Sequence, residues 1–177
     1  MDTTASLPRL ALQTSRLTLV PCSPALARLA LNDPLALGGE LDAAVPSSWP
    51  HPGLLGLLSS LIDSPAGADA ERGWGPWLLF LAPDRLLVGE AGFKGCPDNE
   101  GAVEIGYSIV PRHQRRGLAT EAVEQLLQWA LLHPGVEAVR AECDPANEPS
   151  IAVLRRLGLT PLDPVEGMLR WELKRPF

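Results

Sequence analysis

The chain has 177 residues, 46% of them hydrophobic and 20% charged, with a formal net charge of −6. This balance excludes general disorder, and the acidic excess argues against direct nucleic-acid binding. No apolar run reaches the roughly 18 residues of a membrane helix, and the start lacks the basic and apolar blocks of a signal peptide. We therefore expect a soluble, cytoplasmic protein without a membrane partner, folded as a single domain over 1–177 with a loose segment at 1–15.

The cysteines predict reduced structural thiols and no metal site. They form no CxxC pair, and no histidine lies at metal-ligand spacing beside them. An odd number of widely separated thiols is also a poor disulfide framework. The three residues are Cys22, Cys96 and Cys143.

The first part of the chain predicts strands with one clear helix near its start. Ser23 and Pro24 are typical of a helix cap and a first helical residue, and the turn at 83–85 joins two apolar strands. Residues 32–76 are punctuated by Pro, Gly and Asp and predict only one further helix. In chain order the elements are a strand at 16–20, helices at 24–31 and about 54–62, and strands at 77–81, 86–93 and 102–110.

The second part changes from a period of two to a helical period. Apolar residues recur at helical spacing after Gly117, and Gly158 provides a stop for a second helix. The predicted elements are a helix at 117–132, a strand at 136–143, a helix at 149–157 and a strand at 168–173. The whole pattern predicts a mixed α/β fold.

The segment 110–121 carries the strongest chemical signal. A strand ends at Val110, a basic loop follows, and a helix begins near Gly117. The first N–H groups of a helix have no internal partner and carry partial positive charge, so this turn can cradle a pyrophosphate. A solvated basic turn is the competing interpretation. The sequence has neither the P-loop motif nor the glycine pattern of dinucleotide-binding folds.

The sequence from Gln114 to Ala119 (QRRGLA) resembles the Q/R-x-x-G-x-G/A signature of the GNAT superfamily of N-acyltransferases. Its surroundings are similar to those of the RimJ/RimL-type branch, and the match spans about 102–159. The supporting motifs are Glu104-Ile105-Gly106-Tyr107, Thr120-Glu121-Ala122, Asn147-x-x-Ser150 and Leu157-Gly158-Leu159.

This resemblance implies a GNAT fold, with a central mixed sheet of six or seven strands that splays after the fourth strand and is flanked by helices. It also implies acetyl-CoA as cosubstrate and no metal. The pyrophosphate would lie on the backbone amides of 115–119 and the pantetheine arm along the end of the strand, with Asn147 bonding to the arm or merely capping its helix. The implied cofactor residues are Ile109, Val110, Arg112, Gln114, Arg115, Arg116, Gly117, Leu118, Ala119, Thr120 and Asn147.

Strand alternation places Glu104 on the face opposite an apolar set that includes Ile105 and Ile109. A carboxylate in this position can take the amine proton directly or through water. The alternative is a simple ion-pair partner for a neighbouring arginine. The backbone N–H of Val110 is the expected donor to the oxyanion.

The proton for the leaving thiolate can come from more than one source. Ser150 is the candidate acid, although a hydroxyl at a helix start can also serve only as a cap, and water alone can suffice. Tyr107, the only tyrosine, lies on the apolar face and is expected in the core.

The acceptor is open to several interpretations. The branch resemblance implies a protein N-terminal α-amino group, for example of a ribosomal protein. A small-molecule amine (an amino acid, polyamine or aminoglycoside) and a non-catalytic CoA-binding module are the alternatives, and the oligomeric state, a homodimer included, is left open. One group of aromatic and acidic residues could form a pocket for the amine, or it could consist of core tryptophans and scattered surface acids. The residues are Trp49, Trp74, Trp77, Glu40, Asp42, Asp63 and Asp69.

Overall fold

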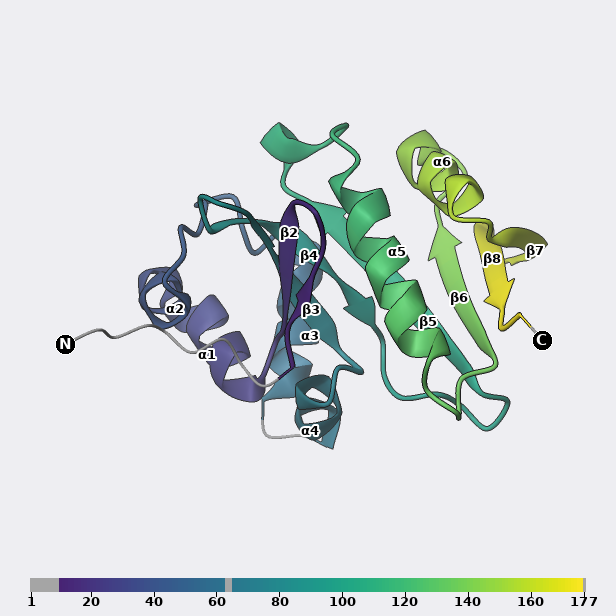
Figure 1. Ribbon diagram of the computed structural model, residues 1–177, viewed down its shortest axis with the longest axis horizontal. Helices are drawn as coiled ribbons and strands as arrows, with labels where there is room; N and C mark the ends of the chain where they lie inside the picture. Colours follow the sequence, from purple (N-terminus) through teal and green to yellow (C-terminus); the bar gives the residue numbers. More distant parts are fainter. Residues whose placement is uncertain (1–9, 63–64, 177) are drawn as a thin grey trace.

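The computed structural model describes residues 10–62 and 65–176. In this part of the chain the strands form one eight-stranded sheet, with helices on both faces (Figure 1). The strands are β1 (Leu12–Gln13), β2 (Leu17–Pro21), β3 (Pro76–Leu81), β4 (Leu86–Phe93), β5 (Ala102–Ile109), β6 (Ala138–Cys143), β7 (Thr160–Val165) and β8 (Met168–Lys174). The helices are α1 (Pro24–Asn32), α2 (Pro34–Leu41), α3 (Pro52–Leu61), α4 (Pro65–Glu71), α5 (Leu118–Leu131) and α6 (Glu148–Arg156).

The sheet has the order β1-β2-β3-β4-β5-β6-β8-β7. The four pairs from β1–β2 to β4–β5 are antiparallel, whereas β5 and β6 run parallel because α5 returns the chain across the sheet. β6, β8 and β7 are again antiparallel. The predicted mixed α/β sheet is therefore confirmed, and the GNAT-like order of its elements with it.

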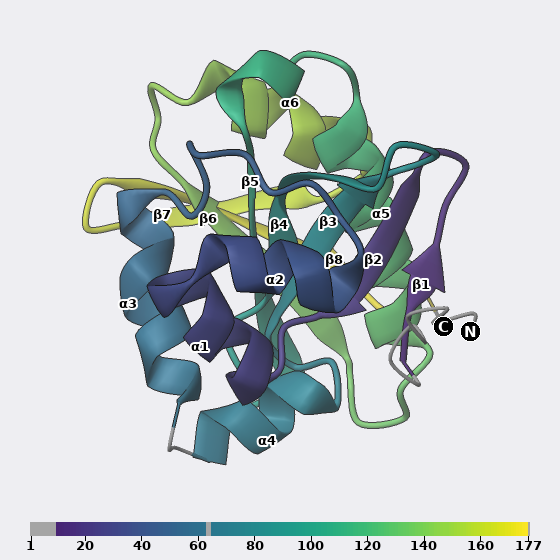
Figure 2. The same ribbon diagram turned by 90° about the vertical axis from the view of Figure 1, so that its left-hand side faces the viewer.

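Two apolar cores lie on opposite faces of the sheet. One packs β-strand residues such as Leu79 and Ile105 against Leu126 of α5 and Leu154 of α6. The other lies between the strands and helices α1 to α4, which stand in front of the sheet in Figure 2. Since α5 and α6 share one face and α1 to α4 cover part of the other, the face of β6 and β8 away from α6 carries no helix of the described chain.

The helices between residues 24 and 71 begin at capping residues, only some of which were recognised from the sequence. Ser23 caps α1 by accepting from Leu26 N–H, as predicted, and Asp33 caps α2 in the same way through Ala36 N–H. Helix α2 was not predicted because two adjacent glycines are unfavourable in a helix interior. One of them, Gly38, is needed for a close approach: an added Cβ would lie 2.8 Å from the carbonyl oxygen of Ala43.

The sheet has more strands than the six or seven expected. Pro161 and Pro164 argue against a strand at β7, but β7 is the outermost strand of the sheet, where missing N–H groups are tolerated. β1 is the other addition. It lies within the segment expected to be loose at 1–15, and its pairing of Leu12 with Leu19 corrects that expectation for these residues. Residues 1–9 lie outside the described part of the chain.

Candidate active site

Strands β5 and β6 separate after only three paired positions. Their parallel register runs from Ala102 opposite Ala138 to Glu104 opposite Arg140 and stops there, although β5 continues to Ile109. The sheet therefore splays at the strand where the sequence predicted it.

Backbone groups of β5 face the gap that this splay opens. Residues of an antiparallel pair alternate between those that bond to the neighbour and those that point away. Val110 N–H donates to Val88 C=O at 2.9 Å, which fixes the alternation between β4 and β5. Tyr107 and Ile109 fall in the other set, so their backbone N–H and C=O groups point away from β4, towards the gap.

A cavity of about 670 Å³ lies at the wide end of the splay, between the end of β5, the loop before α5 and the first turns of α6. It is open to solvent on one side. Its walls are Tyr107, Ser108, Ile109, His113, Gln114, Arg115, Gly117, Leu118, Ala119, Thr120, Asn147, Glu148, Pro149, Ser150, Ala152 and Val153.

The loop before α5 is shaped for close approach to its backbone. Arg115 and Gly117 both have positive φ angles, of 59° and 76°, and Gly117 is the N-cap of α5. A Cβ built on Gly117 would meet only the Arg16 guanidinium, at 3.4 Å, so the cap is not enclosed by protein. Free N–H groups of the first helical turn, together with turns of this handedness, form concavities that suit anions.

Residues 14–16 also form hydrogen bonds with this loop and with the first turn of α5. Arg16 donates from Nη1 to the carbonyl of Arg116 at 2.8 Å and from Nε to Glu121 at 2.7 Å. Thr14 and Ser15 donate to the same carboxylate. Burial raises the pKa of Glu121, but these hydrogen bonds from Thr14, Arg16 and Ser15 outweigh it and hold the pKa below its usual value.

Most of the predicted cofactor residues lie together on this cavity. They are Ile109, Gln114, Arg115, Gly117, Leu118, Ala119, Thr120 and Asn147. Val110, Arg112 and Arg116 do not line it. One detail is corrected: the Val110 N–H cannot serve as the oxyanion donor, because it already donates to Val88.

Asn147 and Ser150 begin α6 on the opposite wall. Asn147 accepts from Ser150 N–H at 3.2 Å and is thus a helix cap, as the competing interpretation held, while it also faces the cavity. Ser150 lines the cavity too. The geometry is therefore compatible with a cap and an arm-binding role for Asn147, and with a cap and an acid role for Ser150.

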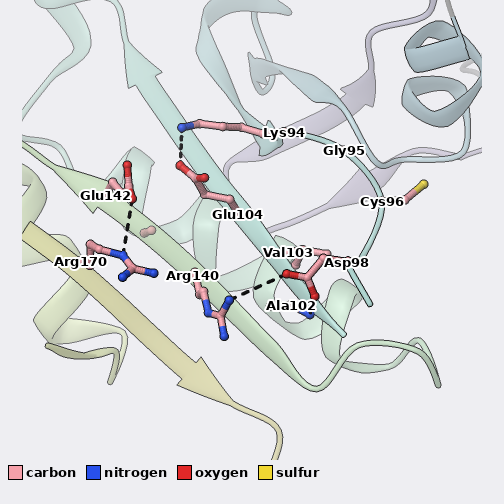
Figure 3. Close-up of a pocket in the computed structure, with 11 residues that line it drawn as sticks. Lys94, Gly95, Cys96, Asp98, Ala102, Val103, Glu104, Arg140, Glu142 and Arg170 are labelled. Atoms are coloured by element: carbon pink, nitrogen blue, oxygen red, sulfur yellow. Dashed lines mark hydrogen bonds and ion pairs between the residues drawn. The ribbon is translucent and has the colours of Figure 1, made fainter. Parts of the chain in front are cut away.

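Glu104 lies outside this cavity, at the closed end of the splay. It lines a separate pocket of about 290 Å³ on the other face of the sheet and forms an ion pair with Lys94 (Figure 3). Its side chain is 33% exposed. The partner is a lysine on the neighbouring segment and not the arginine that the competing interpretation invoked, although Arg140 lies opposite in the register.

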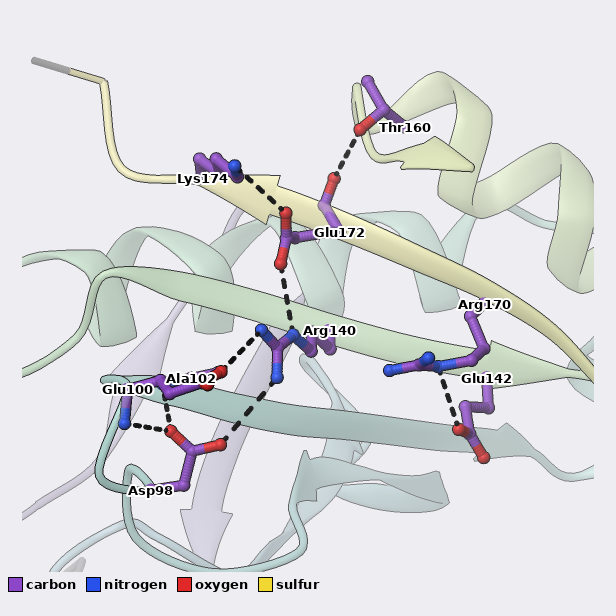
Figure 4. Close-up of polar contacts among 9 residues, drawn as sticks. All are labelled: Asp98, Glu100, Ala102, Arg140, Glu142, Thr160, Arg170, Glu172 and Lys174. Carbon is purple, nitrogen blue, oxygen red and sulfur yellow. Dashed lines mark hydrogen bonds and ion pairs between the residues drawn. The ribbon is translucent and has the colours of Figure 1, made fainter. Parts of the chain in front are cut away.

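Arg140 is held by three carboxylates. Glu172 lies at 3.1 Å, Glu100 at 3.3 Å and Asp98 at 3.8 Å from its guanidinium nitrogens (Figure 4). Arg170 is paired with Glu142 at 3.6 Å beside it. The uncovered face of β6 and β8 is thus a mixed array of charges that neutralise one another.

Only part of the aromatic and acidic group comes together: Trp49 and Asp42 line a cavity of about 1080 Å³ beside α2, whereas the other two tryptophans lie elsewhere. Trp49 is buried on the α1–α4 side and donates to Glu90 at 2.7 Å, whereas Trp77 is buried on the α5 side. Trp74 packs against Phe93 and Trp129. These side chains belong to the two cores, and Asp63 lies outside the described residues.

Several residues of the cavity wall were not among the predicted site residues, and two of them, His113 and Tyr107, carry polar side-chain groups. His113 is 7% exposed, and neither ring nitrogen has a hydrogen-bond partner among the described residues. Burial, with the charges of Arg116 and Arg112, lowers its pKa. Tyr107 packs against the core on the α5 side, as expected, and it also lines the cavity. The alternation of β5 alone could not show this, because it does not disclose where β6 departs.

The described residues hold neither a membrane span nor a metal cluster. No helix within 10–62 and 65–176 is long and apolar enough to cross a bilayer. The same residues contain no group of three or more His, Cys, Asp or Glu side chains that could hold a metal ion.

Comparisons with known proteins agree with this geometry. The profile of the family described as acetyltransferase (GNAT) domain matches residues 16–160. The chain is 29% identical over 119 residues to the uncharacterized N-acetyltransferase YjdG of Bacillus subtilis (strain 168), covering 67% of this chain and 71% of that protein.

Solved structures share the fold. An acetyltransferase from Agrobacterium tumefaciens str. C58 superposes with a TM-score of 0.63 at 24% identity, over 93% of this chain and 94% of that one. RimL, a ribosomal L7/L12 α-N-protein acetyltransferase in complex with coenzyme A, does so with a TM-score of 0.61 at 18% identity, over 93% and 98%. The chain belongs to the acetyltransferase (GNAT) domain family and is an acyltransferase.

Proposed function

We propose that this acyltransferase binds acetyl-CoA in the splay cavity and transfers the acetyl group to a primary amine. The observation that carries the proposal is that three features of the fold meet at one cavity. The exposed cap of α5, the edge of β5 that no strand pairs with, and the first turn of α6 all face one cavity of about 670 Å³. An anionic group with an extended arm fits a helix N-terminus that adjoins an unpaired strand edge.

Different groups of this chain would bind different parts of acetyl-CoA. Backbone N–H groups from Arg115 to Ala119 would hold the pyrophosphate, and the exposed Arg115 would add formal charge from the cavity wall. The gap-facing edge of Tyr107 and Ile109 would pair with the pantetheine arm. Gln114 Nε2 donates to the Ile109 carbonyl at 2.9 Å, so the arm must displace or share this contact.

Direct attack by the amine is the mechanism that the cysteines favour. Cys22 and Cys143 are buried, and burial, with a smaller effect of Glu90, raises the pKa of Cys22 to about 12. Cys96 is exposed and lines the Glu104 pocket, not the cofactor cavity, and partial burial and Asp69 raise its pKa. A covalent cysteine intermediate would need an accessible thiolate beside the thioester.

Glu104 is the proposed proton acceptor for the amine. It is the last β5 residue paired with β6, so it marks the point where the gap opens, and its carboxylate faces the pocket on the uncovered side. An acceptor that enters from that side would meet the acetyl group brought in from the cavity side. The amine would first displace Lys94 from the carboxylate. The oxyanion donor that fits the alternation is the Ile109 N–H, in place of Val110, which leaves Tyr107 and the Ile109 carbonyl to pair with the arm.

The acceptor class we propose is a protein N-terminal α-amino group. The pocket beside Glu104 opens onto a sheet face that no described helix covers, and an extended peptide needs such access. The shared fold with the ribosomal-protein acetyltransferase RimL supports the same class.

The test is release of CoA thiol with a library of N-terminal peptides beside free amino acids, polyamines and aminoglycosides. Turnover with peptides, and product masses that place the acetyl group on the α-nitrogen, is the expected result. Turnover confined to small amines would overturn the acceptor class alone. Acetyl-CoA binding without turnover on any acceptor would favour the non-catalytic module.

A further inference from the structure

Lys94 is bound to the carboxylate that we propose as the proton acceptor for the amine. It follows β4 directly, and its backbone N–H donates to the Glu104 carbonyl at 2.9 Å, so the two residues lie opposite one another on adjacent segments. Residues paired in this way carry their side chains on the same face of the sheet. The Lys94 ammonium forms an ion pair with the Glu104 carboxylate, towards which the side chain extends in Figure 3.

The Glu104 carboxylate has no competing partner within the part of the chain that the structure describes. Its hydrogen bond and ion pair are both with Lys94, whereas Arg140 and Arg170 in the same pocket are paired with other carboxylates. The Lys94 side chain is 57% exposed. An ion pair this exposed is weak, so the amine can leave the carboxylate and return to it.

The pair lies where the gap between β5 and β6 begins. Glu104 opposite Arg140 is the last paired position of these strands, and Lys94 and Glu104 line the same pocket of about 290 Å³. In the proposed complex the thioester reaches this end of the gap from the cavity side. Lysine has a flexible four-carbon stem, which lets its amine move from the carboxylate to a group held nearby. A nucleophile that belongs to the enzyme also needs no diffusional encounter.

We propose that Lys94 is a site of self-acetylation, at which the enzyme transfers an acetyl group to its own Nζ when no other acceptor is bound. The inference rests on the proposed function and adds a modification site to it. The ammonium gives a proton to Glu104 or water, and the neutral nitrogen bonds to the acetyl carbon. The carbon–sulfur bond breaks with its electron pair on sulfur, which takes up a proton from water. The nitrogen loses a second proton to solvent, so the product is a neutral amide that no longer pairs with Glu104.

The chain contains an internal control, because it has only two lysines. Lys174 ends β8, and its Nζ lies 3.7 Å from the Glu172 carboxylate. Its side chain is 78% exposed, and it lines neither the cofactor cavity nor the Glu104 pocket. Chemical acetylation by acetyl-CoA from solution would therefore favour Lys174, whereas transfer within the enzyme favours Lys94.

The test incubates the full chain with acetyl-CoA and no acceptor, and mass spectrometry of its peptides locates the acetyl group. Lys94 should be labelled at least about 10-fold faster than Lys174, at a rate per chain that does not depend on protein concentration. Lys174→Arg should be labelled at Lys94 like wild type, whereas Lys94→Arg keeps the cation beside Glu104 and should gain no acetyl group there. Glu104→Gln should slow the labelling of Lys94 by about 10–100-fold.

Equal labelling of the two lysines, or undiminished labelling of Lys94 in Gly117→Trp, would overturn the inference in favour of chemical acetylation. A rate that rises with protein concentration would overturn transfer within one chain. Turnover on an added peptide or amine while Lys94 stays unmodified would also overturn the inference and leave the proposed function intact. Failure of the wild type to bind acetyl-CoA, or binding without transfer to any amine, would instead refute the proposed function, and this inference with it.

Discussion

The guanidinium Nε of Arg16 lies 2.7 Å from Oε2 of Glu121, although 105 residues separate them in the chain. The contact joins the turn before β2 to the first turn of α5. Through its second nitrogen Arg16 also holds the carbonyl of Arg116, directly beside the cap of α5. The proposed cofactor loop is thus anchored to the turn between β1 and β2, and its shape depends on residues outside the signature motif.

We predict that Glu121→Ala lowers both stability and affinity for acetyl-CoA. The variant removes the acceptor of several hydrogen bonds at a partly exposed site, so the free energy of unfolding should fall by about 1 kcal/mol. Because the folded pKa of Glu121 is lowered, this stability is present above the unfolded pKa near 4.3 and is lost as pH falls through the folded value. Urea unfolding at several pH values checks it, with the exposed Glu124→Ala as control. A difference in stability between wild type and Glu121→Ala that persists at pH 2 would contradict the electrostatic explanation.

Removal of the Arg115 charge should weaken acetyl-CoA binding in a salt-dependent way. Arg115 lines the cavity but is exposed, so Arg115→Ala should cost about fivefold in Kd at low ionic strength and less at high salt. Arg72→Ala, at a site away from the cavity, is the control. Equal affinities for wild type and Arg115→Ala at low salt would remove this residue from the binding site.

Glu104→Gln should lower the rate of transfer while leaving acetyl-CoA affinity nearly unchanged, because Glu104 lies outside the cofactor cavity. With a peptide α-amino acceptor the loss should be about 10–100-fold near neutral pH. It should shrink as pH approaches the amine pKa of about 7.7–8.0, since solvent then supplies neutral amine. Rate profiles from pH 6.5 to 9 test this, with Glu142→Gln in the same pocket as control. A wild-type profile for Glu104→Gln would show that the carboxylate serves only its ion pair.

His113→Phe should stabilise the fold. Its buried ring nitrogens have no partner among the described residues, and such groups cost about 1–3 kcal/mol, so the variant should gain about 1 kcal/mol at pH 8. The folded pKa of His113 is lowered, so the wild type binds fewer protons when folded and loses stability as pH falls below about 6.5. The advantage of the variant should therefore grow towards pH 5.

His133→Phe is the matched control for that experiment. The His133 Nδ1–H donates to the carbonyl of Trp129 at 2.9 Å, so replacement of the ring should destabilise the fold. Chemical unfolding at pH 8 and pH 5 compares the two variants. A loss of stability in His113→Phe would contradict the cost assigned to the unpaired ring nitrogens.

The sequence predicted the parts of the site whose geometry is local. A strand, a basic loop and a glycine-capped helix in succession determine where free N–H groups and small side chains fall, so the motif alone was enough to place Gly117 and Ala119. Strand alternation likewise placed Glu104 away from the apolar face, and its position in the pocket on the uncovered side confirms this.

The remaining features depend on contacts between distant segments. The hydrogen bond from Val110 N–H to Val88 C=O depends on the pairing register of β4 with β5. The position of Tyr107 beside Ser150 depends on where β6 diverges from β5. Neither follows from a spacing in one segment. Strand β7 was not predicted for a similar reason, because only the completed sheet shows that a segment with two prolines lies at its edge.

The central claim is that acetyl-CoA binds with its pyrophosphate on the cap of α5, and calorimetric titration of Gly117→Trp tests it most directly. The φ of 76° already disfavours a side chain at this position, and an indole would cover the exposed N–H groups. Gly135→Trp, in an exposed loop where an added Cβ meets nothing within 4 Å, is the control, and thermal unfolding confirms that both variants are folded. The account predicts one acetyl-CoA per chain for wild type and Gly135→Trp, and an affinity reduced at least about 100-fold for Gly117→Trp. Wild-type affinity in a folded Gly117→Trp would contradict it.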